Sequence, residues 1–171
     1  MIKAVVAVDR NLAIGNKGSL LFRIPSDLKH FKKETLLKTV IMGRKTLESM
    51  PKGQPLKGRN TLVLSASMPE GLFWMNGSFF ARSFKTKEAL LDWAAEHLPA
   101  ETLVIAGGEQ VYRQFLNDCD ELVVTELEEA ANEADAYFPS YKENFEIYEE
   151  SAPFCENGLH YTIRRYRRKH V

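Results

Sequence analysis

The sequence has little of what marks several large classes of protein. It contains only two cysteines, Cys119 and Cys155, too few for a disulfide framework and without the spacing of metal ligands. Its 23 Lys and Arg residues balance 23 Asp and Glu residues, so no overall field favours nucleic acid or a membrane surface. The apolar run from Ile2 to Val8 is far shorter than a membrane span, and we find no signal peptide. We therefore expect a cytoplasmic protein that uses no metal and binds neither nucleic acid nor membrane.

Two short stretches are nonetheless strongly charged. Residues 126–135 are acidic and residues 164–169 are basic. Short charge runs usually lie on solvated surface, and we expect both to be exposed. The sequence contains neither Gly-x-Gly-x-x-Gly nor the P-loop pattern, which excludes a Rossmann fingerprint and a Walker A loop.

The order of the predicted elements indicates the fold class. The length of 171 residues suits one domain, residues 1–171, with a sizeable core. Short Val-rich strands alternate with helices through most of the chain, which predicts a mainly parallel twisted sheet of about eight strands with four flanking helices. The last two strands lack a helix between them and should form an antiparallel C-terminal edge. The expected strands are 2–8, 39–42, 61–64, 79–82, 102–106, 121–125, 145–150 and 159–168, and the expected helices are 25–35, 44–50, 87–97 and 109–116, while 72–75 has no clear assignment.

The stretch from Ala13 to Thr35 contains the first candidate site. A loop with two glycines leads into a helix whose first turn is marked by Pro25. Leu28 and Phe31 lie on one face of that helix, and the carboxylate of Asp27 borders the same face. A carboxylate in this position suits a binding site. The helix dipole also favours an acidic residue in the first turn, so Asp27 could simply stabilise the start of the helix.

Two further candidates follow predicted strands. Gly107-Gly108 turns one strand into a helix, and Gly43-Arg44-Lys45-Thr46 does so after another. Ligands of open α/β sheets bind at the carboxyl ends of strands, where a turn without side chains lets backbone N–H groups approach a pyrophosphate. A tight turn needs glycine in any case, so the Gly-Gly pair alone fits a purely structural turn as well as a phosphate-binding one.

Separated motifs along essentially the whole chain resemble the dihydrofolate reductase family. They are Ile14-Gly15, Ile24-Pro25, Asp27-Leu28 with Phe31 and Thr35, residues 43–46, Pro55-Leu56, Gly58-Arg59, Gly107-Gly108, Val111-Tyr112, Asp135 and Phe138-Pro139. The resemblance implies NADPH-dependent reduction of 7,8-dihydrofolate to tetrahydrofolate for one-carbon metabolism. It also implies a monomer that binds diaminopyrimidine and pteridine antifolates.

The resemblance assigns a set of residues to NADPH. The loop from Ala13 through Leu20 should fold over the nicotinamide, and Arg44 should hold the 2′-phosphate. Ala66 stands where a polar residue is common, so Lys45 or Arg82 would have to add charge there. The implied cofactor residues are Ala7, Ile14, Gly15, Leu20, Gly43, Arg44, Lys45, Thr46, Leu64, Ser65, Arg82, Gly107, Gly108, Gln110 and Val111.

The resemblance also assigns the substrate site. Asp27 would bind the pteridine, with Thr125 bonded to its carboxylate, and would assist proton delivery to N5. Burial should raise the pKa of Asp27 more than the helix dipole lowers it. Arg59 would pair with the glutamate α-carboxylate of the substrate. The implied catalytic residues are Asp27, Phe22 and Thr125, and the implied substrate residues are Val5, Ala7, Asp27, Leu28, Phe31, Met50, Leu56, Arg59, Ala106 and Tyr112.

The chain departs from the family at Leu21-Phe22, where Pro-Trp is usual. Phe cannot donate the hydrogen bond of an indole N–H, and Leu removes a fixed φ, so we expect a looser lid with activity retained. A reductase of a ribosylated aminopyrimidine is an alternative that has no need of Arg59. A binding module that has kept only the fold is a second alternative, favoured by Leu21-Phe22 alone.

Overall fold

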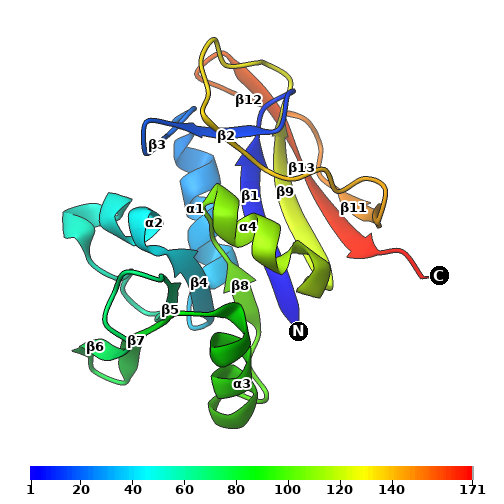
Figure 1. Ribbon diagram of the computed structural model, residues 1–171. Helices are drawn as coiled ribbons and strands as arrows, with labels where there is room; N and C mark the ends of the chain where they lie inside the picture. Colours follow the sequence, from blue (N-terminus) through cyan, green and yellow to red (C-terminus); the bar gives the residue numbers. More distant parts are fainter. Residues whose placement is uncertain (171) are drawn as a thin grey trace.

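The computed structural model describes residues 1–170 and has a ten-stranded main sheet (Figure 1). The strands lie in the order β11-β13-β9-β1-β8-β4-β5-β7-β6, and β12 pairs with β13. Their bounds are β1 Ile2–Val8, β4 Thr39–Gly43, β5 Asn60–Leu64, β6 Gly71–Asn76, β7 Phe79–Phe84, β8 Leu103–Ile105, β9 Glu121–Leu127, β11 Phe145–Glu150, β12 Phe154–Glu156 and β13 Leu159–Arg168. A separate small sheet joins β2 (Ala13–Asn16) to β3 (Ser19–Leu20) and β10 (Ala136–Tyr137).

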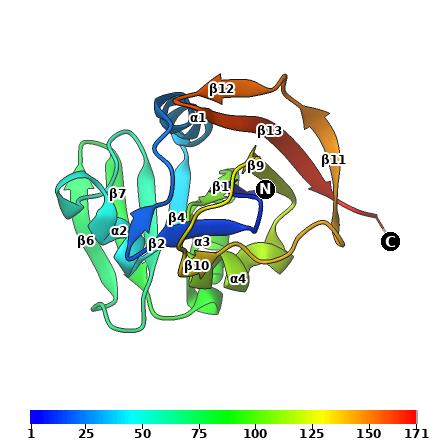
Figure 2. The same cartoon turned by 90° about the horizontal axis from the view of Figure 1, so that it is seen from above.

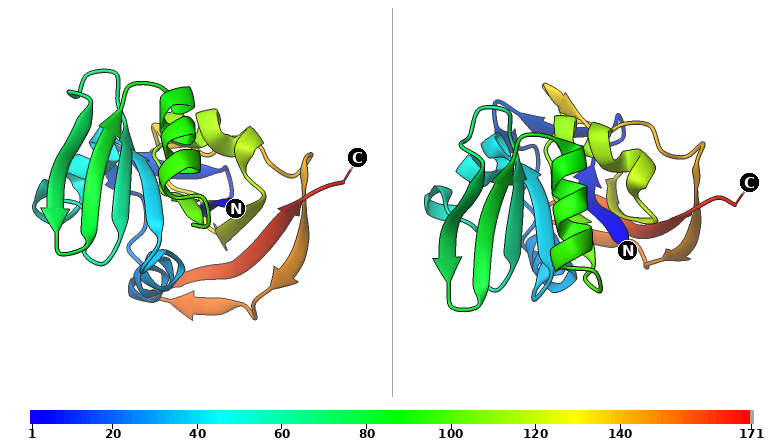
Figure 3. Two further views of the ribbon diagram at one scale, coloured as in Figure 1. Left: turned by 90° about the horizontal axis from the view of Figure 1, so that it is seen from below. Right: turned by 60° about the horizontal axis from the view of Figure 1, so that its bottom comes forward.

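Helices cover both faces of the main sheet. They are α1 Pro25–Thr35, α2 Arg44–Ser49, α3 Lys87–His97 and α4 Glu109–Phe115, with 3-10 turns at Pro51–Gly53 and Leu116–Asp118. One core cluster packs α3 and α4 against the sheet, and a second packs the side chains of α1 and α2 against its other face (Figures 2 and 3). The central strands β1, β4, β5 and β8 pair in parallel and are buried almost throughout, as strands covered on both faces must be. None of the helices in residues 1–170 is long and apolar enough to cross a membrane.

The expected α/β architecture, with its four α-helices and antiparallel C-terminal edge, is confirmed. The main sheet has two strands more than expected. One is β6, which pairs antiparallel with β7 through a tight turn at Gly77, where φ is +63°. The other is β12, a three-residue strand beside β13. The stretch that we expected to be a loop, Ala13–Leu20, forms β2 and β3, because β10 from far along the chain pairs with β2.

The expectation that both charge runs are solvated surface was wrong at Glu126 and Arg164. The two runs lie on neighbouring strands, β9 and β13, and the Glu126 side chain, 12% exposed, forms an ion pair with Arg164. Glu126 also accepts hydrogen bonds from the hydroxyls of Tyr141 and Tyr166. Burial alone would raise the pKa of Glu126, but these three donors hold it below its ordinary value.

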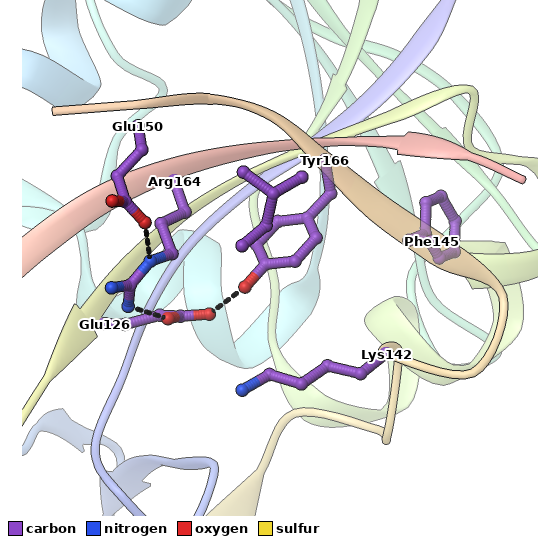
Figure 4. A pocket seen from close by; sticks show the side chains of 7 residues that line it. Glu126, Lys142, Phe145, Glu150, Arg164 and Tyr166 are labelled. Atoms are coloured by element: carbon purple, nitrogen blue, oxygen red, sulfur yellow. Dashed lines mark hydrogen bonds and ion pairs between the residues drawn. The ribbon is translucent and has the colours of Figure 1, made fainter.

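Figure 4 shows Glu126 between Arg164 and Tyr166, with Glu150 on the far side of the guanidinium. These side chains line a hollow of about 450 Å³ together with Lys142, Phe145 and Ile147. The charges in this hollow balance one another, since the cations of Arg164 and Lys142 offset the carboxylates of Glu126 and Glu150. The cluster therefore ties β9 to β13 and to β11.

Glu34, in the last turn of α1, anchors that helix to the sheet. Its carboxylate is buried and accepts a bond of 2.7 Å from Lys3 on β1, while Arg165 on β13 pairs with its other oxygen. Burial alone would raise the pKa of Glu34, but the two cations lower it to about 2. A carboxylate whose folded pKa lies below its unfolded value stabilises the fold fully above the unfolded pKa, 4.5, and loses that stabilisation as the pH falls toward 2.

Replacing Glu34 by Gln should therefore lower the free energy of unfolding at pH 7 by about 3–5 kcal/mol, because Lys3 stays buried without a counter-charge. The variant should also lose less of its stability than the native protein between pH 4.5 and pH 2. Urea unfolding across this range measures both effects. Glu146→Gln is the control, since the pair of Glu146 with Arg167 is exposed and should contribute less than about 1 kcal/mol. Equal stability of the Glu34 and Glu146 variants would contradict an anchoring role for Glu34.

Candidate active site

The candidate motifs meet at one edge of the sheet. The carboxyl ends of β1, β4 and β8 are neighbours, because β8 pairs in parallel with both other strands. The backbone N–H of Gly43, at the end of β4, donates to the carbonyl of Gly107 at 2.9 Å. The small sheet lies beyond the end of β1 at the same edge, above α2 and α4 in Figure 1.

Asp27 lies in the first turn of α1 and is partly buried. The helix begins as expected with Pro25 at its first position, and no side chain caps it. Thr125, 98 residues along the chain on β9, donates from Oγ1 to Asp27 Oδ1 at 2.6 Å. Burial raises the pKa of Asp27, which the Thr125 bond and His30 only partly oppose. The structure thus places an aspartate that holds its proton more tightly than usual beside an apolar surface.

Apolar side chains follow Asp27 along α1 and form an apolar surface beside it. Leu28 is 42% exposed and Phe31 is half-buried, and Phe31 packs with Met50 against the same core cluster. Phe22 packs beside Ala7 against a neighbouring cluster that includes Ile24 and Tyr161. The remaining predicted apolar residues are Val5, which is buried, and Leu56 and Ala106, which are half-buried.

Arg59 is buried rather than exposed, with 6% of its surface accessible. Its Nη1 donates to Thr35 Oγ1 at 3.1 Å, and its Nε donates to the carbonyl of Lys57 at 2.9 Å. No acidic side chain among residues 1–170 forms an ion pair with it, and burial lowers its pKa. A buried guanidinium held in place by neutral partners is a ready receptor for the carboxylate of a ligand.

Three glycines bring the starts of α2 and α4 close together. Gly107 has a φ of +108°, and a Cβ there would lie 3.2 Å from the ring of Tyr112. A Cβ on Gly108 would lie 3.4 Å from Thr46 Oγ1, and one on Gly43 would lie 3.3 Å from Val111. The peptide bond between Gly107 and Gly108 is cis. The positive φ of Gly107 strongly favours glycine, and the two other glycines allow this close approach, which places bare backbone beside the Thr46 hydroxyl.

The cations that could meet a 2′-phosphate differ in how they are held. Arg44 is 39% exposed and pairs with Glu48 at 2.6 Å, and Lys45 is exposed. Arg82 instead lies over the ring of Trp93, 5.3 Å from its centroid. The sequence interpretation missed Lys85, whose Nζ donates to the carbonyls of Ala66 and Met68 in the loop after β5. The feature that could have identified Lys85 is its position just after β7, because β7 pairs directly with β5 in the sheet.

The other predicted residues lie on the same two sides of the site. Tyr112 is 6% exposed, and its hydroxyl donates to the carbonyl of Val5 at 2.8 Å, so that it supports the end of β1 from within the core. On the cofactor side, α4 contributes Gln110, which is exposed, and Val111, which is buried. In the small sheet, Ile14 is half-buried, Gly15 pairs with β10, and Leu20 is 69% exposed. At the end of β5, Leu64 is buried, and the Ser65 that follows it bonds with Ser67.

This α/β fold, with glycine-containing turns at the carboxyl ends of neighbouring parallel strands, belongs to the class of protein that binds dinucleotides at that edge of the sheet. The model of the family described as dihydrofolate reductase matches residues 1–168. The chain belongs to the dihydrofolate reductase family.

Relatives and a solved structure agree with this assignment. Dihydrofolate reductase HdrB of Haloferax volcanii is 38% identical over 142 residues, which cover 80% of this chain and 70% of that protein. Dihydrofolate reductase type 3 of Salmonella typhimurium is 36% identical, with 82% and 80% covered. The dihydrofolate reductase of Enterococcus faecalis, solved with NADP(H) and a compound named RAB-propyl, superposes with a TM-score of 0.81 at 28% identity, covering 99% of this chain and 97% of that one.

Longer relatives also match. The bifunctional dihydrofolate reductase-thymidylate synthase of Daucus carota is 35% identical over 175 residues, which cover 96% of this chain. The chain spans 33% of the length of that relative.

Proposed function

We propose that the protein reduces 7,8-dihydrofolate to 5,6,7,8-tetrahydrofolate with NADPH and so supplies tetrahydrofolate for one-carbon metabolism. The observation that supports this most strongly is the pair of polar anchors at opposite ends of α1. Asp27 lies in its first turn, and Arg59 bonds to Thr35 in its last turn. Asp27 and Thr35 are eight residues apart, about 12 Å along the helix axis. A ligand with N–H donors at one end and a carboxylate at the other fits these anchors.

In this proposal each part of dihydrofolate has its own partners. The Asp27 carboxylate accepts two parallel N–H bonds from the 2-amino-pyrimidinone edge, and Arg59 binds the glutamate α-carboxylate. The apolar side chains between them enclose the pteridine and aminobenzoyl rings, namely Val5, Ala7, Leu28, Phe31, Met50, Leu56 and Ala106. Tyr112 acts from behind this surface by holding the backbone of Val5.

The residues present fit NADPH, because the close approach at Gly43, Gly107 and Gly108 leaves backbone where phosphates need N–H donors. When bound, NADPH supplies the hydride. Thr46 would add its hydroxyl, and Arg44, Ser65 and Lys85 would surround the 2′-phosphate. The other residues proposed to touch the cofactor are Ala7, Ile14, Gly15, Leu20, Lys45, Leu64, Arg82, Gln110 and Val111.

The raised pKa of Asp27 gives the chain its chemical role. A carboxyl that keeps its proton nearer neutrality can assist delivery of that proton to N5 of the substrate. Thr125 fixes the carboxyl by its hydrogen bond. The small sheet would exclude water from above, and Phe22 would add only apolar surface there.

We further propose a cytoplasmic monomer that binds diaminopyrimidine and pteridine antifolates. Such compounds offer Asp27 the same pair of N–H donors as the substrate. The free thiols of Cys119 and Cys155 suit a reducing compartment.

The test is the oxidation of NADPH or NADH in the presence of dihydrofolate or a ribosylated aminopyrimidine. We expect turnover of dihydrofolate with a strong preference for NADPH. Arg44→Ala should narrow this preference by about ten- to a hundredfold, since it removes a charged partner of the 2′-phosphate. Glu48→Gln is the matched control, because it removes the ion-pair partner of Arg44 and leaves the guanidinium. Equal use of both cofactors by the native protein, or faster turnover of the aminopyrimidine, would contradict the proposal.

A further inference from the structure

Glu109 joins two parts of the molecule that are distant in sequence. It is the first residue of α4 and directly follows the Gly107-Gly108 turn. Its Oε1 accepts a hydrogen bond of 2.7 Å from the backbone N–H of Tyr137 in β10, 28 residues away. Its Oε2 accepts one of 3.0 Å from Nε of Arg113, one turn along α4. Each oxygen of this carboxylate thus has its own partner.

A second contact joins the same two segments. The ring of Tyr112 in α4 packs edge-on against that of Phe138, with 4.8 Å between the ring centroids. The same Tyr112 ring lies against Gly107, where an added Cβ would come within 3.2 Å of it. One polar and one apolar contact therefore connect the Gly107-Gly108 turn to consecutive residues at the end of β10.

The segment around β10 in turn holds the small sheet. The backbone N–H of Asp135 donates to the carbonyl of Gly15 at 3.0 Å, and its carboxylate accepts from the backbone N–H of Lys17 at 2.9 Å. The backbone N–H of Phe138 donates to the carbonyl of Leu12 at 2.8 Å. Figure 2 shows β10 beside β2. The position of β2 therefore depends on that of β10.

The bond from Tyr137 is the main reason why the pKa of Glu109 lies below its ordinary value, and Arg113 lowers it further. Burial and the nearby Asp135 carboxylate oppose this only in part. The side chain is thus an ionised acceptor at neutral pH, and a hydrogen bond to an ionised acceptor is stronger than one to a neutral group.

We propose that Glu109 is a positioning residue that couples the Gly107-Gly108 turn to the small sheet β2-β3-β10. The inference rests on the proposed role of that turn in binding the cofactor phosphates. Phosphates that fix the turn also fix the start of α4, and Glu109 passes this restraint to the backbone of Tyr137. The sheet that closes over the site then becomes ordered when the cofactor binds. Since such coupling is reciprocal, removing it must weaken cofactor binding by the same factor.

Amide hydrogen exchange with and without NADPH tests the coupling. The amides of Lys17, Asp135 and Phe138 report on the small sheet without bonding to Glu109. In the native protein, NADPH should slow exchange both at these amides and at residues 107–110. In Glu109→Ala, protection at 107–110 should persist, while the protection that NADPH adds to the sheet should fall about tenfold, as expected for one charge-assisted bond. The dissociation constant of NADPH should rise by a similar factor.

Two control variants separate the bond to Tyr137 from the ion pair. Glu109→Gln keeps an oxygen acceptor for the Tyr137 N–H but removes its charge, so its coupling should lie between those of the native protein and Glu109→Ala. Arg113→Met removes only the ion pair and should keep most of the coupling. The Glu109 side chain is partly exposed, 24%, so Glu109→Ala should fold, and its unfolding midpoint verifies this.

Each outcome bears on a different claim. Equal protection of the sheet by NADPH in the native protein and in Glu109→Ala would overturn the coupling. Loss of coupling in Arg113→Met to the same extent as in Glu109→Ala would overturn the role of the Tyr137 bond. Absence of protection at 107–110 in the native protein would refute the phosphate site, and the coupling with it.

Discussion

Replacing Asp27 by Asn should lower kcat for dihydrofolate at neutral pH by about two orders of magnitude or more, the usual share of general acid–base catalysis. Asn keeps the shape of the side chain and can still accept the hydrogen bond from Thr125. It has no ionisable proton to give to the substrate. Steady-state kinetics at saturating NADPH measures the change in kcat directly.

The pH dependence gives the same prediction a second readout. Burial raises the pKa of Asp27 above 3.8, so turnover by the native protein should fall as the pH rises through that higher pKa. The Asn variant should lack this transition. It should regain rate only at low pH, where dihydrofolate arrives already protonated, and its affinity for NADPH should stay nearly unchanged.

Thr125→Val is a matched control for the position of the carboxyl. It removes the hydrogen bond to Asp27 Oδ1, one of the interactions that lowers the pKa of Asp27, and leaves the carboxyl in place. The transition in the pH profile should therefore shift to higher pH but remain visible. A fully active Asp27→Asn variant with the native pH profile would show that Asp27 has no role in catalysis and only stabilises the first turn of α1.

The sequence predicted local structure well wherever the signal was local. Pro25 marked the first residue of α1, and the buried strands that end at Gly43 and just before Gly107 followed from short apolar runs ending in glycine. The hairpin of β6 and β7 also had a local signal, Asn76-Gly77, which the unassigned range 72–75 left unused. Leu72 and Phe73 in β6 are exposed, so the strand lacks the alternation that a half-buried strand would show.

Contacts between distant residues could not be read from composition or spacing. The bond between Asp27 and Thr125 spans 98 residues, and only the resemblance to a family had paired them. The charge runs were misjudged for the same reason, because nothing local shows that β9 and β13 are neighbours and bring Glu126 to Arg164. Glu109 is a further case, since its partner in β10 lies 28 residues downstream.

Replacing Arg59 by Ala should raise the KM and Kd for dihydrofolate by about a hundredfold, since it removes one half of a charged pair whose other half belongs to the ligand. A pterin without the glutamate should bind almost equally well to the variant and to the native protein. Isothermal titration with both ligands measures the difference. Arg23→Ala serves as a control, because Arg23 is exposed and should affect neither ligand.

Arg59 also has structural partners, so the variant could lose affinity by disturbing the loop around it. Thr35→Val separates the two causes, because it removes the bond to Arg59 Nη1 and keeps the guanidinium and its bond to Lys57. This variant should weaken dihydrofolate binding by less than Arg59→Ala does, and it should likewise leave the glutamate-free pterin unaffected. If Arg59→Ala weakened both ligands alike, the buried guanidinium would be a structural group. The apolar surface along α1 would then have only one polar anchor, Asp27, and a substrate without a carboxylate would fit it better than dihydrofolate.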